Sequence, residues 1–160
     1  MDIEIKRVNY SDSSHAAALT MLLNEYAQDP MGGGQPLDAA TLKSLPEKLA
    51  QFPTAFSFIA YVEGKPAGLI NCFFGFSTFA AQPLVNIHDV TVRPEFRGLG
   101  LSKKLSAAVE ALAKEQGCCK LTLEVLSGNE IAMQAYKKGG FAAYELDPEA
   151  GQAIFWQKKL

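Results

Sequence analysis

The stretch from Val85 to Leu112 constrains this chain more than any other, because its residue pattern changes there from that of a strand to that of a helix. Between Val85 and Val92, β-branched apolar residues alternate with polar ones, which is typical of a half-buried strand. Pro94 has no N–H to give to a strand ladder and so ends it. From Leu101 to Leu112 apolar residues recur at helical spacing. The predicted order is therefore strand, short loop, glycine turn and helix.

The turn Gly98-Leu99-Gly100 has the properties of an anion site. Glycines let the backbone approach a ligand closely. The start of a helix offers unpaired N–H groups and the positive end of the macrodipole. Arg97 adds a permanent cation beside them. We therefore predict that a phosphate or pyrophosphate binds at this turn.

This stretch could be one of three known kinds of phosphate site, or a plain surface turn. A P-loop requires GxxxxGK[ST], and the chain contains no such run. A dinucleotide fingerprint requires GxGxxG directly after the strand, but Lys103 stands at the third glycine position and a five-residue segment separates the strand from Gly98. Glu124, at the end of a later strand, nevertheless lies at a suitable distance for a ribose contact. The third pattern is Arg-x-x-Gly-x-Gly/Ala, whose positions hold Arg97, Gly100 and Ser102.

Two motifs together resemble the GNAT superfamily of N-acetyltransferases. Val92-Arg93-Pro94 followed by Arg97–Ser102 resembles the acyl-CoA loop of that family, with Ser102 in the place of a glycine or alanine. The second motif, Asn-x-x-Ala-x-x-x-Tyr followed by glycine-phenylalanine, has its positions filled by Asn129, Ala132, Tyr136 and Gly140-Phe141, and Gly139 replaces the usual leucine. The resemblance covers about residues 55 to 145, and the N-terminal third fits only in its order of elements.

The resemblance implies an α/β (α+β) fold with a mixed, mostly antiparallel central sheet flanked by helices, in which the fourth and fifth strands splay apart for CoA. The residue pattern itself predicts the order β α α β β β α β α β β. The expected strands are residues 3–8, 55–62, 66–76, 85–92, 119–125, 141–146 and 153–159. Because 160 residues suit one core, we expect a single N-acetyltransferase domain over 1–160.

The resemblance also assigns residues to CoA. Backbone groups of Val90, Thr91 and Val92 would pair with the pantetheine amides. The pyrophosphate would lie against Arg97 and the N–H groups of Gly98, Leu99, Gly100, Leu101 and Ser102. Lys103 would reach a nucleotide phosphate, or else is a solvated helix lysine, and Asn129 would belong to the cofactor site.

Acetyl transfer to an amine requires removal of a proton from the amine and protonation of the leaving thiolate. Family members often carry a glutamate four residues before the valine of Val-x-Pro, and this chain has His88 there. An imidazole, with a reference pKa of about 6.5, suits a base, although a structural strand histidine is the alternative. Asp89 can orient His88 only if a bulge intervenes, and Glu124 is a second candidate base. Tyr136 matches the family's proton donor to the thiolate.

Composition limits the classes of partner, metal site and cell compartment that fit this chain. A net charge of −2 without a basic stripe argues against a nucleic-acid partner. The three cysteines, Cys72, Cys118 and Cys119, form no CxxC pair or cluster with histidines, so we expect a reducing compartment and no metal. The chain begins without a signal-peptide pattern and lacks an apolar run of membrane-spanning length. We expect a cytoplasmic protein with no membrane partner, and a homodimer stays open.

The expected function is an acetyltransferase that uses acetyl-CoA as cosubstrate and a primary amine as direct nucleophile. A small molecule, either a polyamine or an amino-acid-like amine, is the first choice of acceptor, and a protein N-terminus or lysine is the second. A non-catalytic acyl-CoA-binding module is the alternative from another class, and a nicotinamide enzyme is third.

A glycine-rich segment and a group of phenylalanines each have two possible roles. The segment Met31–Pro36, with glycine at 32, 33 and 34, is either a connector between helices or a mobile flap over a substrate. The aromatic residues Phe74, Phe76 and Phe79 belong either to the core or to the wall of an acceptor site.

Overall fold

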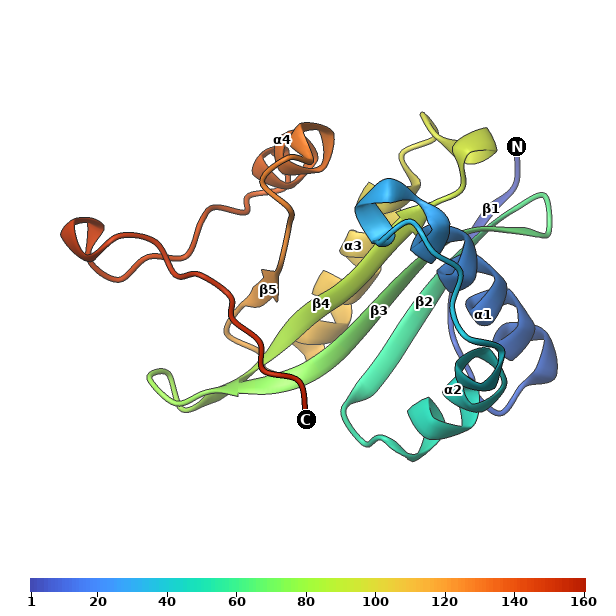
Figure 1. The fold of residues 1–160 in the computed structure, drawn as a ribbon, viewed down its shortest axis with the longest axis horizontal. Helices are drawn as coiled ribbons and strands as arrows, with labels where there is room; N and C mark the ends of the chain where they lie inside the picture. The colour runs from blue at the N-terminus through green and yellow to red at the C-terminus, as the bar shows by residue number, and fades with distance from the viewer. The chain divides into compact units, whose positions relative to one another are not determined.

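The computed structural model describes residues 1–160, which divide into two compact units, Met1–Glu124 and Val125–Leu160. The first unit contains a five-stranded sheet and three α-helices, and the second contains one α-helix (Figure 1). Each unit is described below by itself. The expectation of a single domain stays a prediction. None of the helices combines the length and the hydropathy needed to span a bilayer.

The sheet of the first unit is mixed and mostly antiparallel, as expected. Its strands are β1 (Ile3–Arg7), β2 (Ala55–Val62), β3 (Lys65–Ser77), β4 (Gln82–Val92) and β5 (Leu121–Leu123). They lie in the order β1-β2-β3-β4-β5, with antiparallel pairing from β1 to β4 and parallel pairing between β4 and β5. A tight turn joins β2 to β3, and both of its central residues, Glu63 and Gly64, have positive φ, at 49° and 72°. That conformation matches the twist of a hairpin.

The helices cover both faces of this sheet. α1 (Ser13–Gln28) and α2 (Ala39–Gln51) lie on one face, and α3 (Leu101–Glu115) lies behind the sheet in the view of Figure 1. Asp12 caps α1 and Asp38 caps α2, each through a side-chain oxygen that accepts backbone N–H groups. A short 3₁₀ turn over Pro30–Gly32 follows α1.

The core is built from one apolar face of α1 and one of α3, packed on opposite faces of the sheet. Leu19 and Leu22 of α1 are fully buried against Ile59 of β2 and Leu69 of β3. On the other face α3 buries a stripe one residue wide, made of Leu101, Leu105, Val109 and Ala113. Burying one such leucine or valine side chain is worth about 1.5–3 kcal/mol, so these stripes hold the helices to the sheet.

β4 and β5 separate after a short pairing. The parallel ladder joins Val85–Ile87 only to Leu121–Leu123. β4 then continues to Val92 with β3 as its one neighbour, since Gly68 still faces Val92. The expected splay is therefore present, and it leaves one edge of β4 without a strand from residue 88 onward.

The second unit differs from the expectation. α4 (Glu130–Lys138) forms as predicted, but residues 141–146 and 153–159, which we expected to be strands, are not strands. The structure gives one backbone hydrogen bond between the two segments, from Ala153 N to Tyr144 O at 3.2 Å. An isolated two-stranded pair is marginal by itself, and residues 125–160 contain no third strand to support it.

Candidate active site

A β-bulge in β4 lies at the point where β4 and β5 separate. Asn71 of β3 faces Asp89, but the next residue, Cys72, faces Ile87, so His88 is an extra residue in β4. Such a bulge interrupts the alternation of side chains between the two faces of a strand. As a result, His88 and Asp89 both line the same cavity. The bulge that Asp89 needs in order to lie on the same side as His88 is therefore present.

The cavity lies between this part of the sheet and the helices α1 and α2, and its volume is about 320 Å³. That is near the small end of ligand pockets, which span about 300–1,000 Å³. The apolar part of its wall comes from α1, the following loop, α2 and β3, and consists mainly of Leu23, Leu37, Leu45, Leu49 and Phe73. The polar part of the wall is formed by Tyr26, Asn71, His88 and Asp89.

His88 is exposed at this cavity. Its imidazole packs against the Phe73 ring in an edge-on contact, with centroids 5.4 Å apart and planes at 85°. An aromatic contact of this kind restricts how the imidazole can turn. His88 is thus held by packing at the cavity wall while the residue stays exposed.

Asp89 is held by a chain of hydrogen bonds that crosses the sheet. Asn71 Nδ2 donates to Asp89 Oδ2 at 3.0 Å, and Ser57 Oγ donates to Asn71 Oδ1 at 2.6 Å. The Tyr10 hydroxyl lies 2.8 Å from Ser57 Oγ. Because a serine hydroxyl has one proton, which Ser57 gives to Asn71, Tyr10 is the donor in that pair. Every donor in the chain therefore points toward the Asp89 carboxylate.

This chain is buried where it crosses the sheet, since Ser57 is 1% exposed and Asn71 is 4% exposed. No buried side-chain nitrogen or oxygen lacks a hydrogen-bond partner. On the cavity wall, burial raises the pKa of Tyr26, and the Asp89 and Asp29 carboxylates raise it further. Tyr26 consequently stays a neutral phenol near neutral pH.

The loop between β4 and α3 has the form of an anion site. Gly98 and Gly100 have φ of 82° and 72°, a region that favours glycine. Gly100 is the N-cap of α3 and offers no side chain, so the first-turn N–H groups of the helix have no side-chain cap. Arg97, Ser102 and Lys103 are exposed around this turn. The predicted positions therefore fit a pyrophosphate through backbone N–H groups and nearby cations.

Two of the predicted contacts are restricted by burial and pairing. The Leu101 side chain is 2% exposed and packs in the core, so only its N–H can serve a ligand. Val90, Thr91 and Val92 pair with β3 on one side, and β5 does not reach them on the other. Their backbone lies along the open edge of β4, where the resemblance puts the pantetheine.

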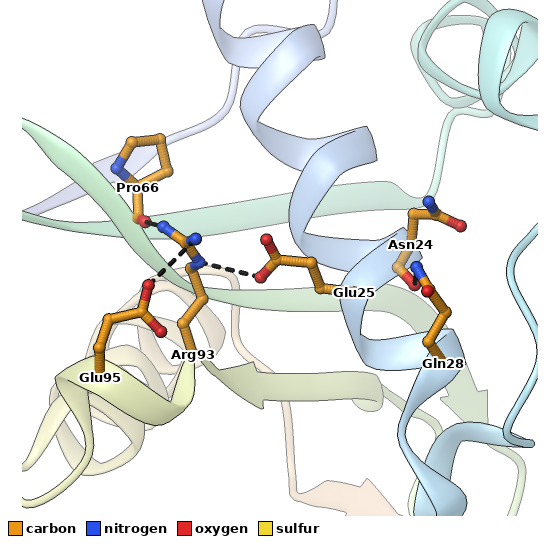
Figure 2. A network of polar contacts seen from close by, with 6 residues as sticks. All are labelled: Asn24, Glu25, Gln28, Pro66, Arg93 and Glu95. Carbon is orange, nitrogen blue, oxygen red and sulfur yellow. Dashed lines mark hydrogen bonds and ion pairs between the residues drawn. The ribbon is translucent and has the colours of Figure 1, made fainter.

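Arg93, which belongs to the Val-x-Pro motif but had no predicted role, anchors the start of this loop (Figure 2). Arg93 Nε lies 2.9 Å from Glu25 Oε2 of α1, and Arg93 Nη2 lies 3.0 Å from Glu95 Oε1. Arg93 Nη1 also donates to the carbonyl of Pro66 at 3.4 Å. The guanidinium, which lies over the Phe96 ring, thus connects α1, the start of β3 and the glycine loop.

The segment Met31–Pro36 is fastened to the end of α1. Gly34 N donates to Asp29 O at 3.0 Å, and Gln35 N donates to Ala27 O at 3.1 Å. A Cβ on Gly32 would lie 2.0 Å from Tyr26 O, so only glycine fits there. Gly32 also lines the cavity. The segment therefore gives Gly32 to the cavity wall, and a role as a moving flap stays a prediction.

The aromatic residues proposed for the wall lie elsewhere. Phe76 and Phe79 are 63% and 88% exposed, and neither lines the cavity. Phe74 packs on Phe56, with ring centroids 4.8 Å apart. The phenylalanine that lines the cavity is instead their neighbour Phe73. Glu124, the second candidate base, is exposed and is not part of the cavity wall.

Two predicted site residues belong to the second unit. Asn129 is the N-cap of α4, and its Oδ1 accepts a hydrogen bond from Ala132 N at 3.2 Å. The Tyr136 ring contacts Phe141 edge-on, with centroids 5.9 Å apart. The motif residues of α4 therefore have local structural roles, and their roles toward CoA and the thiolate stay predictions.

The chain is similar to known acetyltransferases over most of its length. The model of the acetyltransferase (GNAT) family matches residues 19–141. Thialysine N-epsilon-acetyltransferase of Caenorhabditis elegans is 30% identical over 123 residues, which cover 76% of this chain and 74% of that protein. The match to the Bos taurus enzyme of the same name is 37% identical over 68 residues and spans only 39% of that enzyme and 42% of this chain.

Aminoglycoside acetyltransferases are similar in sequence and in fold. The aminoglycoside N(6′)-acetyltransferase type 1 of Salmonella typhimurium is 26% identical over 116 residues, covering 71% of this chain and 76% of that protein. The solved structure of AAC(6′)-Iy with a CoA-containing bisubstrate analogue superposes with a TM-score of 0.78 at 22% identity and covers all of both chains. The bulged fourth strand, the glycine loop before α3 and these matches lead to one conclusion: the chain belongs to the acetyltransferase (GNAT) family.

Proposed function

We propose that this acetyltransferase moves the acetyl group of acetyl-CoA to the primary amine of a small molecule by direct attack of that amine. The observation that carries the proposal is the small cavity at the β4 bulge, with His88 and Asp89 on its wall. The cavity adjoins the open edge of β4, which leads directly to the glycine loop. The relatives named for thialysine and aminoglycosides support a small amine as acceptor.

Acetyl-CoA would supply the reactive thioester when bound. We assign its pantetheine to the backbone of Val90, Thr91 and Val92, which would extend the β4 edge. The N–H groups from Gly98 to Ser102 would hold the pyrophosphate, with Arg97 and Lys103 as nearby cations. Asn129 keeps its assignment to the cofactor site from the motif alone.

His88 is the proposed base. An amine arrives as an ammonium ion and must lose a proton before its nitrogen can attack a carbonyl carbon. His88 takes this proton, the new C–N bond forms and the C–S bond breaks. Tyr136 then gives its proton to the departing thiolate, and the acetylated nitrogen loses its second proton to water, so that the products are an acetamide and a free thiol. The phenol of Tyr136 regains a proton from water, and His88 returns its proton to water.

Thiol release from acetyl-CoA in the presence of a panel of amines tests the proposal, with the product mass showing the added acetyl group. We expect Tyr136→Phe to lower kcat by about tenfold to a hundredfold, at or below the usual effect of an acid–base group. Tyr144→Phe is the matched control, because it removes an exposed phenol of the same unit. We expect Tyr144→Phe to have the wild-type rate.

Two results would contradict the proposal. Equal rates for Tyr136→Phe and wild type would remove Tyr136 from the mechanism. If no amine gives thiol release while calorimetry shows that acetyl-CoA binds, the protein is a non-catalytic acyl-CoA-binding module.

A further inference from the structure

We infer that the acceptor is a small amine with one cationic nitrogen on an apolar body, and that Asp89 binds its ammonium group. The inference rests on the proposed function, because it concerns the acceptor side of the same site. It is narrower than the proposal, which covers polyamines, aminoglycosides and amino acids equally. The charges, the shape and the hydrogen bonds of the cavity carry it.

The charge of the cavity wall is the first argument. Asp89 is the one carboxylate on the wall, and the other titratable side chains there are His88 and Tyr26. One carboxylate can pair with one ammonium. A second ammonium on the same molecule would lie against leucine side chains, and burying an unpaired charge is costly.

The absence of a cation on the wall is the second argument. No lysine or arginine lines the cavity. A free amino acid would bring a carboxylate as well as an amine, and that carboxylate would find neither an ion pair nor an arginine fork in the cavity. An amine without a carboxylate avoids this cost.

The apolar wall is the third argument. Leu23, Leu45 and Leu49 from the helices and Phe73 from β3 surround a volume of about 320 Å³. Such a space favours an alkyl or aryl body, because burying apolar surface is the main source of affinity in pockets of this kind. A polyhydroxylated sugar ring would leave hydroxyl groups facing these side chains without partners.

The hydrogen-bond chain behind Asp89 is the fourth argument. Tyr10, Ser57 and Asn71 each donate toward Asp89, so the chain fixes the position of the carboxylate on the cavity wall. Asn71 occupies Oδ2 of Asp89, and no hydrogen bond in the structure uses Oδ1. Asn71 is thus a positioning residue that directs Asp89, and Oδ1 is available for an ammonium.

Relative kcat/KM values for matched amines test this inference in the full-length protein. Phenethylamine and hexylamine represent apolar monoamines, and putrescine, spermidine, lysine and an aminoglycoside represent the alternatives. We expect the better monoamine to exceed each alternative by about tenfold or more, which corresponds to about 1.4 kcal/mol. Asp89→Asn should lower kcat/KM for the monoamines about a hundredfold through a higher amine KM, with an unchanged KM for acetyl-CoA.

A second variant makes the test independent of Asp89. Leu37 lines the cavity from a loop, so Leu37→Asp adds a second carboxylate without disturbing a helix or strand. We expect Leu37→Asp to raise the putrescine-to-phenethylamine ratio about tenfold, because the second ammonium gains a partner. Leu37→Asn is the matched control, with the same polarity change and no charge, and should leave the ratio low.

The outcomes separate the inference from the proposed function. A wild-type preference for a polyamine, lysine or an aminoglycoside overturns the inference, as does an unchanged amine KM in Asp89→Asn or an equal ratio in Leu37→Asp and Leu37→Asn. In all of these cases the protein still acetylates amines, so the proposed function stands. If the wild-type protein acetylates no amine, the proposed function fails and the inference fails with it.

Discussion

Cys72 is a buried thiol beside the β4 bulge, and its environment makes it a proton-linked contributor to stability. Burial raises the pKa of Cys72 from 9.0 to about 12, and the Asp89 carboxylate adds to the shift. The folded protein therefore keeps this proton between pH 9 and 12, where the unfolded chain loses it. The contribution to stability is fully present below pH 9 and declines as the pH rises toward 12.

We expect the free energy of unfolding to fall through this range, with a share of about 1.4 kcal/mol per pH unit from Cys72. Urea unfolding at pH 8, 9, 10 and 11 measures the slope. Cys72→Ala should be less stable at pH 8 because of the missing side-chain volume, but its slope should be smaller. Cys119→Ala, at an exposed thiol, should keep the wild-type slope. Equal slopes in wild type and Cys72→Ala would contradict the account.

The residues of the site were predictable to different degrees. His88 was identified because it stands at a fixed distance from Val-x-Pro, a property of sequence alone. The bulge was not predictable, because it depends on how β3 and β4 align. A signal for Asn71 and Ser57 did exist, since each is a polar residue inside an otherwise apolar strand. A buried polar side chain must have a partner, and here the partners lead to Asp89.

At the scale of elements, Arg93 links α1 to the loop that precedes α3 through its ion pairs. Its pairs with Glu25 and Glu95 are partly exposed, so each should contribute less than about 1 kcal/mol. The loss of Arg93 removes both pairs and the bond to Pro66 together, and this should loosen the glycine loop. The effect should appear in cofactor binding more than in overall stability.

We expect Arg93→Met to raise the dissociation constant of acetyl-CoA about threefold to tenfold, a loss of about 1 kcal/mol. Isothermal titration calorimetry measures it. Lys114→Met is the control, because it removes an exposed pair with Glu110 on α3, away from the loop. An unchanged affinity in Arg93→Met would show that the Arg93 contacts have no part in binding acetyl-CoA.

The elements were predicted best where their structure depends only on residues close together in the sequence. β2 was predicted over its full length, and β3 to within one residue at each end, because two apolar runs joined by a short turn with Gly64 are typical of a hairpin. β5 is shorter than expected, since it diverges from β4 after Leu123. The two strands expected after α4 did not form, because a strand needs a neighbour and its residue pattern alone does not supply one.

At the scale of the whole chain, the first unit holds the cavity at the β4 bulge, the open edge of β4 and the glycine loop. Along the chain from His88 to Lys103, two residues of the cavity wall come first, then the open edge of β4, and then the glycine loop. The second unit holds α4 with Asn129 and Tyr136. The proposed proton acceptor and the proposed proton donor thus come from different units, which allows each to be tested by its own variant.

The pH dependence of kcat/KM for the amine, measured for wild type and His88→Gln, tests the central claim most directly. The account predicts that the wild-type value falls in acid as the imidazole gains a proton, and that His88→Gln lacks this fall and is slower by about a hundredfold at its best pH. Wild type and His88→Gln should both keep the part of the pH profile that comes from ionisation of the amine substrate itself. An unchanged acid fall in His88→Gln would contradict the assignment of His88 as the base at the β4 bulge.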